Sequence, residues 1–483
     1  MGAVALAGCP AEDLCVPEDD SERVVHVEPA TAPGPDNPTV AGTFSTIQSA
    51  LDAVGGDRGR ATVCVAHGTY YEQLRVPADT HLVAAGEVRV RPPQTRKGAL
   101  PTEVDRVLLT LQTDATVGSI VIDGLDVRGG GLCVDAVGDG AATLRDMMVQ
   151  DCAVGLRARG GTQVTLHDVA MNLHGVWGID AVASTIHAES DTTIRQNGRP
   201  ALPYELTELP ELDAEMGWVA GLSPGRGAVR AVDSDITLVD VLVDENEYSG
   251  AVLDVQGGSL TLRDIVVGAQ RSADNTEGFF AGESGGDGPV VLARDTEVDI
   301  HGFVARSEGQ TLFRVEGGAP FRAVNVDWNG RMPTTSPEGA TGPALEAAGA
   351  ATITLWHATL LGPEGAPGFR FLGDSPATFD LANTIAWGHA SGEGLVVEGA
   401  APVADIRYSL FADASVQGTQ MVTALDPLWT ETSAGLVLDA ASPARCAGAG
   451  DLDVATDLWG NPRPFASDKS PDLGAIELQE ACP

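Results

Sequence analysis

Short segments in which apolar and polar residues alternate return along the chain at nearly constant intervals. The segment 142–146 (ATLRD) returns as 164–168 (VTLHD), 22 residues later. Further along, 236–240 (ITLVD) returns as 260–264 (LTLRD), 24 residues later. Alternation with a period of two is typical of β-strands whose two faces differ in burial. A return at a fixed offset indicates one structural unit that is repeated along the chain.

Each period holds more than one short strand. A second apolar segment precedes a glycine pair, as at 251–255 before Gly257-Gly258. Weaker copies of the main segment occur at 298–300, 353–355 and 378–381. Several short strands per period, separated by Gly and Asn turns, are typical of one coil of a β-helix. We therefore predict an all-β fold, a right-handed parallel β-helix solenoid.

An amphipathic helix is predicted just before the repeats. Its apolar positions fall on one face, Ser45 and Gln48 form a capping-box pattern, and Gly55-Gly56 ends it. The first coil of a solenoid would otherwise expose its apolar interior, so we expect this helix to cap it. The residues of the apolar face are Phe44, Ile47, Leu51 and Val54.

The start of the chain resembles the opening of pectin methylesterases and their β-helix relatives. The resemblance rests on Phe44-x-Thr46-Ile47-Gln48, the apolar segment 61–65, and Gly68-Thr69-Tyr70-x-Glu72. It implies the β-helix fold. The catalytic motifs of such enzymes are not matched, because the sequence has no Asp-Phe dipeptide and only fragments of a Trp-x-Asp-His strand, at 166–168 and 355–357.

The end of the chain resembles the C-terminal segment of bacterial surface β-helix proteins, called a choice-of-anchor Q region. The matching residues are Ser442-Pro443-Ala444, 457–464 and 472–477. The resemblance implies an exported protein. Three parts are therefore expected: a lipobox with an exposed tether (1–40), a parallel β-helix (41–425) and a closing segment (426–483). Interruptions of the period at 197–227, 270–290 and 330–343 are expected to leave the turns; the first contains Tyr204 and Trp218.

Acidic residues outnumber basic ones by 68 to 29, which gives a formal net charge of −39. Such a surface repels phosphate backbones, so we expect no nucleic-acid partner. The sequence has no apolar run of transmembrane length. We expect contact with a membrane only through an N-terminal lipid.

Seven cysteines are present, and none has the Cys-x-x-Cys spacing of a structural zinc site. Residues 6–9 (LAGC) resemble a bacterial lipobox, which makes Cys9 the predicted lipid attachment site. The predicted location is the bacterial cell envelope, at the outer surface or in the periplasm; otherwise the protein is secreted. The alternative, that Cys9 is an ordinary cysteine, is favoured by the short stretch that precedes it.

Without Cys9, six cysteines remain, an even number suited to an oxidising compartment. Cys133 and Cys152 are about one coil apart, Cys15 with Cys64 would tie the tether to the first coil, and Cys446 with Cys482 would hold the C-terminus. These disulfides are hypotheses, because spacing does not determine connectivity.

Four aspartates, Asp146, Asp168, Asp240 and Asp264, occupy equivalent positions in the repeats. Stacked carboxylates repel one another or bind a cation, so Asp240 and Asp264 could hold calcium, with Arg263 beside them. The alternative is that each Asp is a turn residue at a strand end. The same three residues are the weak candidates for catalysis.

The function that we predict is an exported, lipid-anchored protein that presents a rigid face to a carbohydrate or a cell-envelope protein. No catalytic machinery is identifiable, and no cofactor other than calcium is expected. The alternative is a polysaccharide-active enzyme, either a calcium-assisted lyase or a glycoside hydrolase. That alternative requires two carboxylates and an arginine to converge on one face.

Overall fold

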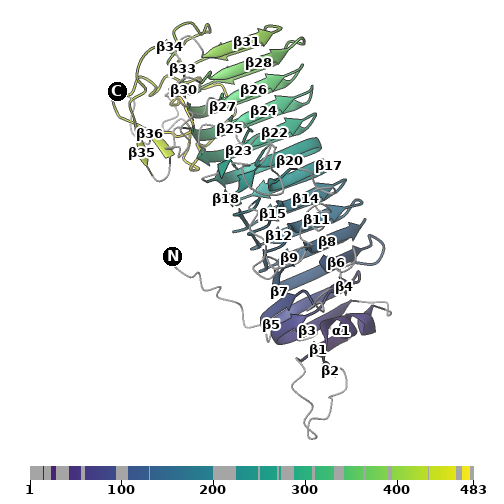
Figure 1. The fold of residues 1–483 in the computed structure, drawn as a ribbon. Helices are drawn as coiled ribbons and strands as arrows, with labels where there is room; N and C mark the ends of the chain where they lie inside the picture. The colour runs from purple at the N-terminus through teal and green to yellow at the C-terminus, as the bar shows by residue number, and fades with distance from the viewer. Residues whose placement is uncertain are drawn as a thin grey trace. The chain divides into compact units, whose positions relative to one another are not determined.

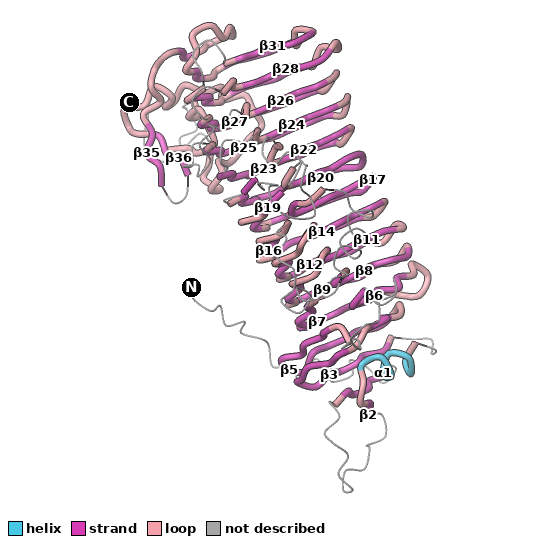
Figure 2. Tube along the Cα trace, in the orientation of Figure 1, coloured by secondary structure: helices cyan, strands magenta, loops and turns pink. Residues whose placement is uncertain are grey.

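A computed structural model describes residues 15, 23–28, 43–55, 60–93, 107–129, 131–198, 225–248, 251–268, 271–272, 288–306, 311–330, 342–362, 366–389, 394–432, 435–463 and 470–478. Within these residues the chain forms two compact units. Unit 1 contains the residues up to Thr193, and unit 2 contains Ile194–Gly198 and the residues from Gly225 onward. The predicted all-β fold is confirmed: both units are right-handed parallel β-helices, and the described residues include one helix (Figures 1 and 2).

Unit 1 consists of coils whose strands pair in parallel with the equivalent strands of the next coil. Leu82, Ile122, Leu144 and Leu166 are successive Cα partners, and all four side chains are fully buried. Such aliphatic stacks form the interior of the unit. Its strands are β1 (Arg23–Val27), β2 (Thr43–Phe44), β3 (Ala61–Tyr71), β4 (Leu74–Val76), β5 (Thr80–Arg91), β6 (Val107–Thr113), β7 (Ile120–Arg128), β8 (Leu132–Gly138), β9 (Ala141–Arg145), β10 (Met148–Gln150), β11 (Val154–Arg159), β12 (Gln163–His167), β13 (Ala170–Asn172), β14 (Trp177–Val182) and β15 (Thr185–Glu189).

Helix α1 (Ile47–Val54) packs its apolar face on β1, β3 and β4, at the start of the coils. Its N-cap is Thr46, which accepts a hydrogen bond from Ser49 N–H, and not the expected Ser45. The carboxylate of Glu72 accepts from the N–H groups of Ile47 (3.0 Å) and Gln48 (2.9 Å). Residues 44–48 and 68–72, which together resemble the opening of the β-helix enzymes, are therefore in direct contact, because Glu72 binds the first turn of the helix.

The expected exposed tether, residues 1–40, contains a paired strand in its described part. Strand β1 runs parallel to β2 and β3, and Val25 and Val27 point inward with exposures of 3% and 0%. Apolar alternation at 23–27 (RVVHV) gives this segment a buried face, so it extends the first coil rather than leaving it. Cys9 lies outside the described residues.

Unit 2 has longer and less regular coils, built in the same way. Leu238, Leu262, Ile300, Ala323 and Leu355 are successive Cα partners inside the stack. Phe303, Phe313, Phe321, Phe369, Phe371, Phe379 and Phe411 add aromatic contacts within its core. The strands form three walls. Its main strands are β16 (Thr193–Arg195, at the boundary), β17 (Gly227–Val239), β18 (Leu242–Asp244), β20 (Leu253–Val267), β22 (Val291–Arg294), β23 (Glu297–Arg306), β24 (Phe313–Glu316), β25 (Pro320–Asn329), β26 (Leu345–Ala348), β27 (Thr352–Leu361), β28 (Phe369–Gly373), β29 (Thr378–Ala382), β30 (Ile385–Trp387), β31 (Leu395–Gly399), β32 (Val403–Arg407) and β33 (Leu410–Phe411).

Five short strands complete unit 2 outside the walls or at the last coil. They are β19 (Glu247–Tyr248), β21 (Arg271–Ser272), β34 (Val422–Thr423) and the pair β35 (Trp429–Thr432) and β36 (Gly435–Leu438). β35 and β36 are antiparallel, whereas β19 pairs with β21 in parallel.

One corner of the coils is a column of residues in the left-handed backbone region. It follows the second wall, which comprises the second half of β20 and strands β23, β25, β27, β29 and β32. Asp and Asn adopt this region at lower cost than other residues with side chains, and glycine adopts it freely. At Gly302 a Cβ atom would also collide with the Asp264 carboxylate. The members in unit 2, all with φ between 47° and 75°, are Asp240, Asp264, Gly302, Asn325, His357, Asn383 and Tyr408.

The C-terminal segment, residues 426–483, lies along the side of several unit 2 coils in its described part (Figure 1). Asn325 donates a hydrogen bond to the carbonyl of Thr456 (2.9 Å), and the N–H of Ala475 donates to Thr359 Oγ1 (2.9 Å). The N–H of Gly474 donates to the carbonyl of Asn383 (2.7 Å). The segment was expected to close the end of the array; these contacts place its described part against the side of the coils, at Asn325 and Asn383 of the corner column.

Arg463 is the centre of this contact. Its side chain is 1% exposed, its guanidinium lies 3.3 Å from Glu477 Oε2, and it donates to the carbonyl of Gly474 (2.9 Å). Burial lowers the pKa of Arg463 to about 10, and the Glu477, Asp457 and Asp472 carboxylates oppose that shift. Asp457 and Glu477 are residues of the C-terminal motif, so the motif encodes a buried ion pair that holds the segment in place.

Two of the three expected disulfides lie in unit 1. Cys15 is bonded to Cys64 and Cys133 to Cys152, with Cα atoms 5.9 and 5.7 Å apart. Cys446 is also disulfide-bonded, and its expected partner Cys482 lies outside the described residues. The described helix is too short to cross a membrane.

The buried His357 predicts a loss of stability in acid. Burial and the Arg463 cation hold the pKa of His357 well below its usual 6.5. Below pH 6.5 the unfolded chain therefore binds a proton that the folded chain does not, and stability falls by up to about 1.4 kcal/mol per pH unit. His357→Asn keeps a side chain suited to positive φ and removes the titration. The urea midpoint of this variant should fall less between pH 7 and 5.5 than that of the wild type. As a control, His187→Asn, at a half-exposed position, should behave like the wild type; equal acid sensitivity of all three proteins would contradict the argument.

Candidate functional site

A row of charged side chains with one tryptophan covers the outside of the second wall in unit 2. Residues at equivalent positions of successive strands are Cα partners, so their outward side chains form columns. We call this surface the Trp356 face. It comprises Arg263, Asp299, His301, Arg322, Trp356, Asp380, Asp405 and Arg407.

Asp299 links two arginines from neighbouring strands. Its carboxylate pairs with Arg263 on β20 and lies 3.1 Å from Arg322 Nη1 on β25. Partial burial would raise the pKa of Asp299, but the hydrogen bonds and charges of the two arginines outweigh it and lower the pKa. The carboxylate is therefore ionised at neutral pH, and its charge is shared between two cations.

Trp356 continues the row across β27. The guanidinium of Arg322 lies 5.7 Å from the centroid of the indole ring, within cation–π range. The indole N–H donates to Asp380 Oδ2 (3.1 Å), whose other oxygen is 2.7 Å from Arg407. The ring is thus held in one orientation while its side chain stays partly exposed.

His301 stands between the two arginines that Asp299 links. Partial burial lowers its pKa, and the neighbouring charge of Arg263 acts in the same direction. The imidazole is therefore neutral at pH 7, and it offers both a donor and an acceptor to a ligand. The whole face supplies alternating donors and acceptors without a dominant charge.

A second row of ion pairs lies on the first wall of the same unit, formed by β20, β22, β24, β26, β28 and β31. Arg294 pairs with Asp254, Arg314 with Glu316 and Glu346, and Arg370 with Glu346 and Glu398. Burial raises the pKa of Asp254. The ion pairs of this row involve no aromatic residue, which distinguishes it from the Trp356 face.

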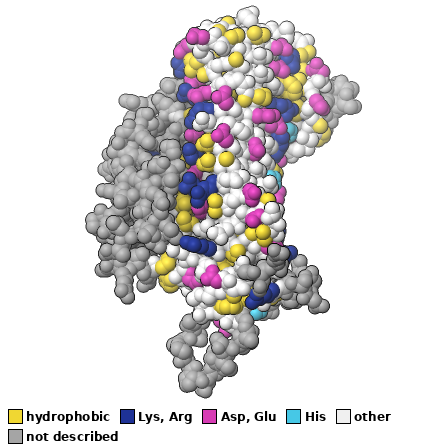
Figure 3. All heavy atoms as spheres, turned by 90° about the vertical axis from the view of Figure 1, so that its right-hand side faces the viewer, with side chains coloured by type: hydrophobic (Ala, Val, Ile, Leu, Met, Phe, Trp, Pro, Cys, Tyr) yellow, Lys and Arg dark blue, Asp and Glu magenta, His cyan; other side chains and the backbone are white. Residues whose placement is uncertain are grey.

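The mixed character of the described surface is visible in Figure 3. On the side shown there, acidic, basic and hydrophobic side chains are interspersed. Pairing across strands explains how a chain with a net charge of −39 carries this pattern, because an arginine on one coil meets carboxylates on the next.

The structure keeps Asp240 and Asp264 at equivalent corner positions of adjacent coils, but the Arg263 guanidinium, proposed to act with them in catalysis or calcium binding, is paired elsewhere. Asp240 and Asp264 lie in the corner column at φ 54° and 53°. Arg263 points to the Trp356 face, where it pairs with Asp299. Two carboxylates supply fewer oxygens than the six to eight that calcium takes. The group of three potential metal ligands found in the described residues is Cys133, Cys152 and His174, and it has no carboxylate.

Sequence reasoning missed most of the Trp356 face. Asp299, Thr354 and Asp380 lie within the weaker repeat copies, and Trp356 lies in the fragment 355–357. Aligning those copies with 260–264 places Asp299 and Asp380 in the column of Thr261. The outward residue of each weaker copy could therefore have indicated the face. The most regular copies instead end in an aspartate, and these aspartates lie at the corner.

No family model matches the sequence, and no curated protein matches it. Among solved structures, pectate lyase Pel9A is similar, with 12% identity and a TM-score of 0.37 over 94% of this chain and 96% of that one. The A-module of the mannuronan C-5 epimerase AlgE4 from Azotobacter vinelandii is similar with 14% identity and a TM-score of 0.33, over 79% of this chain and 92% of that one. Likenesses at these identities extend only to the fold.

Proposed function

We propose that this protein binds a neutral polysaccharide through the Trp356 face and does not act on it chemically. The observation that supports this proposal is the fixed tryptophan inside a row of paired arginines and aspartates. An indole ring offers an apolar surface to the C–H face of a sugar ring, and the paired side chains offer donors and acceptors to its hydroxyls.

The charge of the protein favours a neutral ligand over an acidic one. A net charge of −39 repels a polyanion at long range. On the face itself the arginines are already paired: Arg263 and Arg322 with Asp299, and Arg407 with Asp380 and Asp405. A uronic acid would have to displace these carboxylates, whereas a hydroxyl can bind beside them.

The enzyme alternative needs two carboxylates and an arginine that converge on one face. On the Trp356 face Arg407 does meet Asp380 and Asp405, but its guanidinium is already paired with both carboxylates. Arg263, the first choice for that arginine, points away from the corner aspartates and binds Asp299. The arrangement therefore favours a binding surface.

The rigid stack suits this role. Each side chain of the face is carried by a paired strand, so the face is ordered before the ligand binds. Pre-organisation lowers the entropy lost on binding, and a long polymer can contact several coils at once.

Affinity electrophoresis through gels that contain neutral or uronic-acid polysaccharides tests the binding. We expect retardation by a neutral polymer, and Trp356→Ala should weaken it by about 2 kcal/mol, roughly thirtyfold. Arg322→Ala should also weaken the retardation, because the Arg322 guanidinium packs on the Trp356 ring. Arg314→Ala on the first wall is its matched control, because the Arg314 and Arg322 side chains are both 41% exposed and ion-paired. Its mobility should equal that of the wild type. Retardation by uronic-acid polymers only, or undiminished retardation of Trp356→Ala, would sink the proposal.

We further propose that the protein is exported to the bacterial cell envelope and anchored there by a lipid on Cys9. The lipobox-like residues 6–9 and the acidic residues that follow support this, as do the disulfides of unit 1, which suit an oxidising compartment. The resemblance of the C-terminal segment to surface proteins supports it as well.

Fractionation of cells that express the full gene tests the anchor. The wild type should sediment with membranes, and Cys9→Ser should appear in the soluble fraction, because one missing acyl-bearing cysteine removes the anchor. Cys9→Ser that stays with the membranes would refute the lipid at this position.

A further inference from the structure

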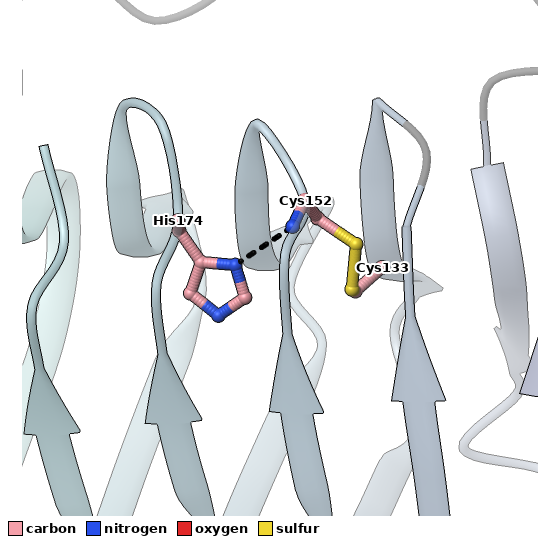
Figure 4. A group of neighbouring side chains, drawn as sticks. All are labelled: Cys133, Cys152 and His174. Carbon is pink, nitrogen blue, oxygen red and sulfur yellow. Dashed lines mark hydrogen bonds between the residues drawn. A yellow bond between two sulfur atoms is a disulfide. The ribbon is translucent and has the colours of Figure 1, made fainter. Parts of the chain in front are cut away.

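Three side chains from consecutive coils of unit 1 meet at one corner (Figure 4). Cys133 belongs to β8, Cys152 to the turn between β10 and β11, and His174 to the turn between β13 and β14. Their potential ligand atoms all lie within 4.8 Å of one another. Two thiol sulfurs and an imidazole nitrogen at this distance form a donor set typical of zinc or copper(I).

The corner is buried, and its backbone leaves room for the imidazole ring. Cys133, Cys152 and His174 have exposures of 0%, 2% and 0%. The imidazole lies over Gly155, where a Cβ atom would come within 2.5 Å of Nε2, so the absent side chain makes the room that the ring occupies. The backbone N–H of Cys152 donates to His174 Nδ1 (3.4 Å), as the dashed line in Figure 4 shows.

The imidazole is in the protonation state that a metal requires. Burial lowers the pKa of His174 to about 3, which disfavours the protonated ring. A neutral imidazole coordinates through a nitrogen lone pair. Coordination through Nδ1 would replace the hydrogen bond from the Cys152 N–H, because both use the same lone pair.

The disulfide decides whether the other two ligands are available. In the structure Cys133 and Cys152 are bonded to each other, and a disulfide does not supply thiolates. A phosphine reductant donates two electrons, the Sγ–Sγ bond breaks, and two protons and the oxygen of one water molecule give two thiols and the phosphine oxide. The sulfurs then remain beside carbonyl oxygens, at 3.0 Å from Gly129 O for Cys152 and 3.5 Å from Gln150 O for Cys133.

Charge balance selects the metal. A divalent ion that replaces the two thiol protons forms a neutral unit with two thiolates, whereas copper(I) leaves one negative charge. A net charge is costly in a buried site. We infer that reduction of the Cys133–Cys152 disulfide converts this corner into a zinc site with Cys133, Cys152 and His174 as three of the four ligands and the fourth position left for a water molecule.

Cobalt(II) as a spectroscopic substitute for zinc tests this site in the full chain. The protein is reduced with phosphine, freed of reductant by gel filtration under anaerobic conditions, and titrated with cobalt(II). We expect a thiolate-to-cobalt charge-transfer band, at one equivalent, that zinc removes by competition. The unreduced protein should show no such band.

Variants separate this corner from the other cysteines. Cys133→Ser with Cys152→Ser should abolish the band, and Cys15→Ser with Cys64→Ser, the matched control at the other described disulfide, should retain it. His174→Asn should raise the dissociation constant for cobalt by more than about tenfold, since loss of even an outer-shell partner of a metal ligand costs that much.

Any one of three results would overturn the inference. The reduced wild type could show no charge-transfer band, phosphine could fail to reduce the Cys133–Cys152 disulfide in the folded protein, or His174→Asn could bind cobalt with unchanged affinity. Near-ultraviolet circular dichroism of each variant establishes that it is folded. If the double serine variant does not fold, the comparison of wild type with His174→Asn still decides.

Discussion

In-register stacking of parallel coils is the constraint on which the other features depend. Strands of adjacent coils lie about 4.8 Å apart, so every residue stands next to its equivalent one coil away. Inside, this produces the aliphatic stack from Leu238 to Leu355; outside, it lets Asp299 reach two arginines. A chain with far more acidic than basic residues thereby gains a face on which donors and acceptors alternate.

The same stacking explains both where sequence reasoning succeeded and where it stopped. The regular copies at 142–146 and 260–264 made the fold predictable, because their inward residues Leu144 and Leu262 occupy the same position in each coil. The Trp356 face depends on outward residues, which differ from coil to coil and have no periodic signature. Arg322 lies next to Trp356 because of the register between β25 and β27. Insertions of different length between the strands hide this register in the sequence.

Contacts that join segments far apart in sequence were also beyond prediction. The C-terminal motif was recognisable, but its partners Asn325, Thr359 and Asn383 lie in coils that precede it by many residues. Likewise, Cys133, Cys152 and His174 have no spacing typical of a metal site. The absence of Cys-x-x-Cys excludes a local zinc motif, yet a solenoid brings ligands together from one coil to the next.

Disulfide trapping tests the proposed register most directly. Thr237 and Thr261 are Cα partners on the outside of the second wall, whereas Ser259 is the partner of Asp235 and stands two residues off. A disulfide requires Cα atoms about 4.4–6.8 Å apart. Peptide mapping by mass spectrometry without reductant should therefore find the bond in Thr237→Cys with Thr261→Cys, and not in Thr237→Cys with Ser259→Cys. A bond in the second pair and not in the first would contradict the register of β17 and β20, and with it the claim that equivalent residues of adjacent coils stand side by side.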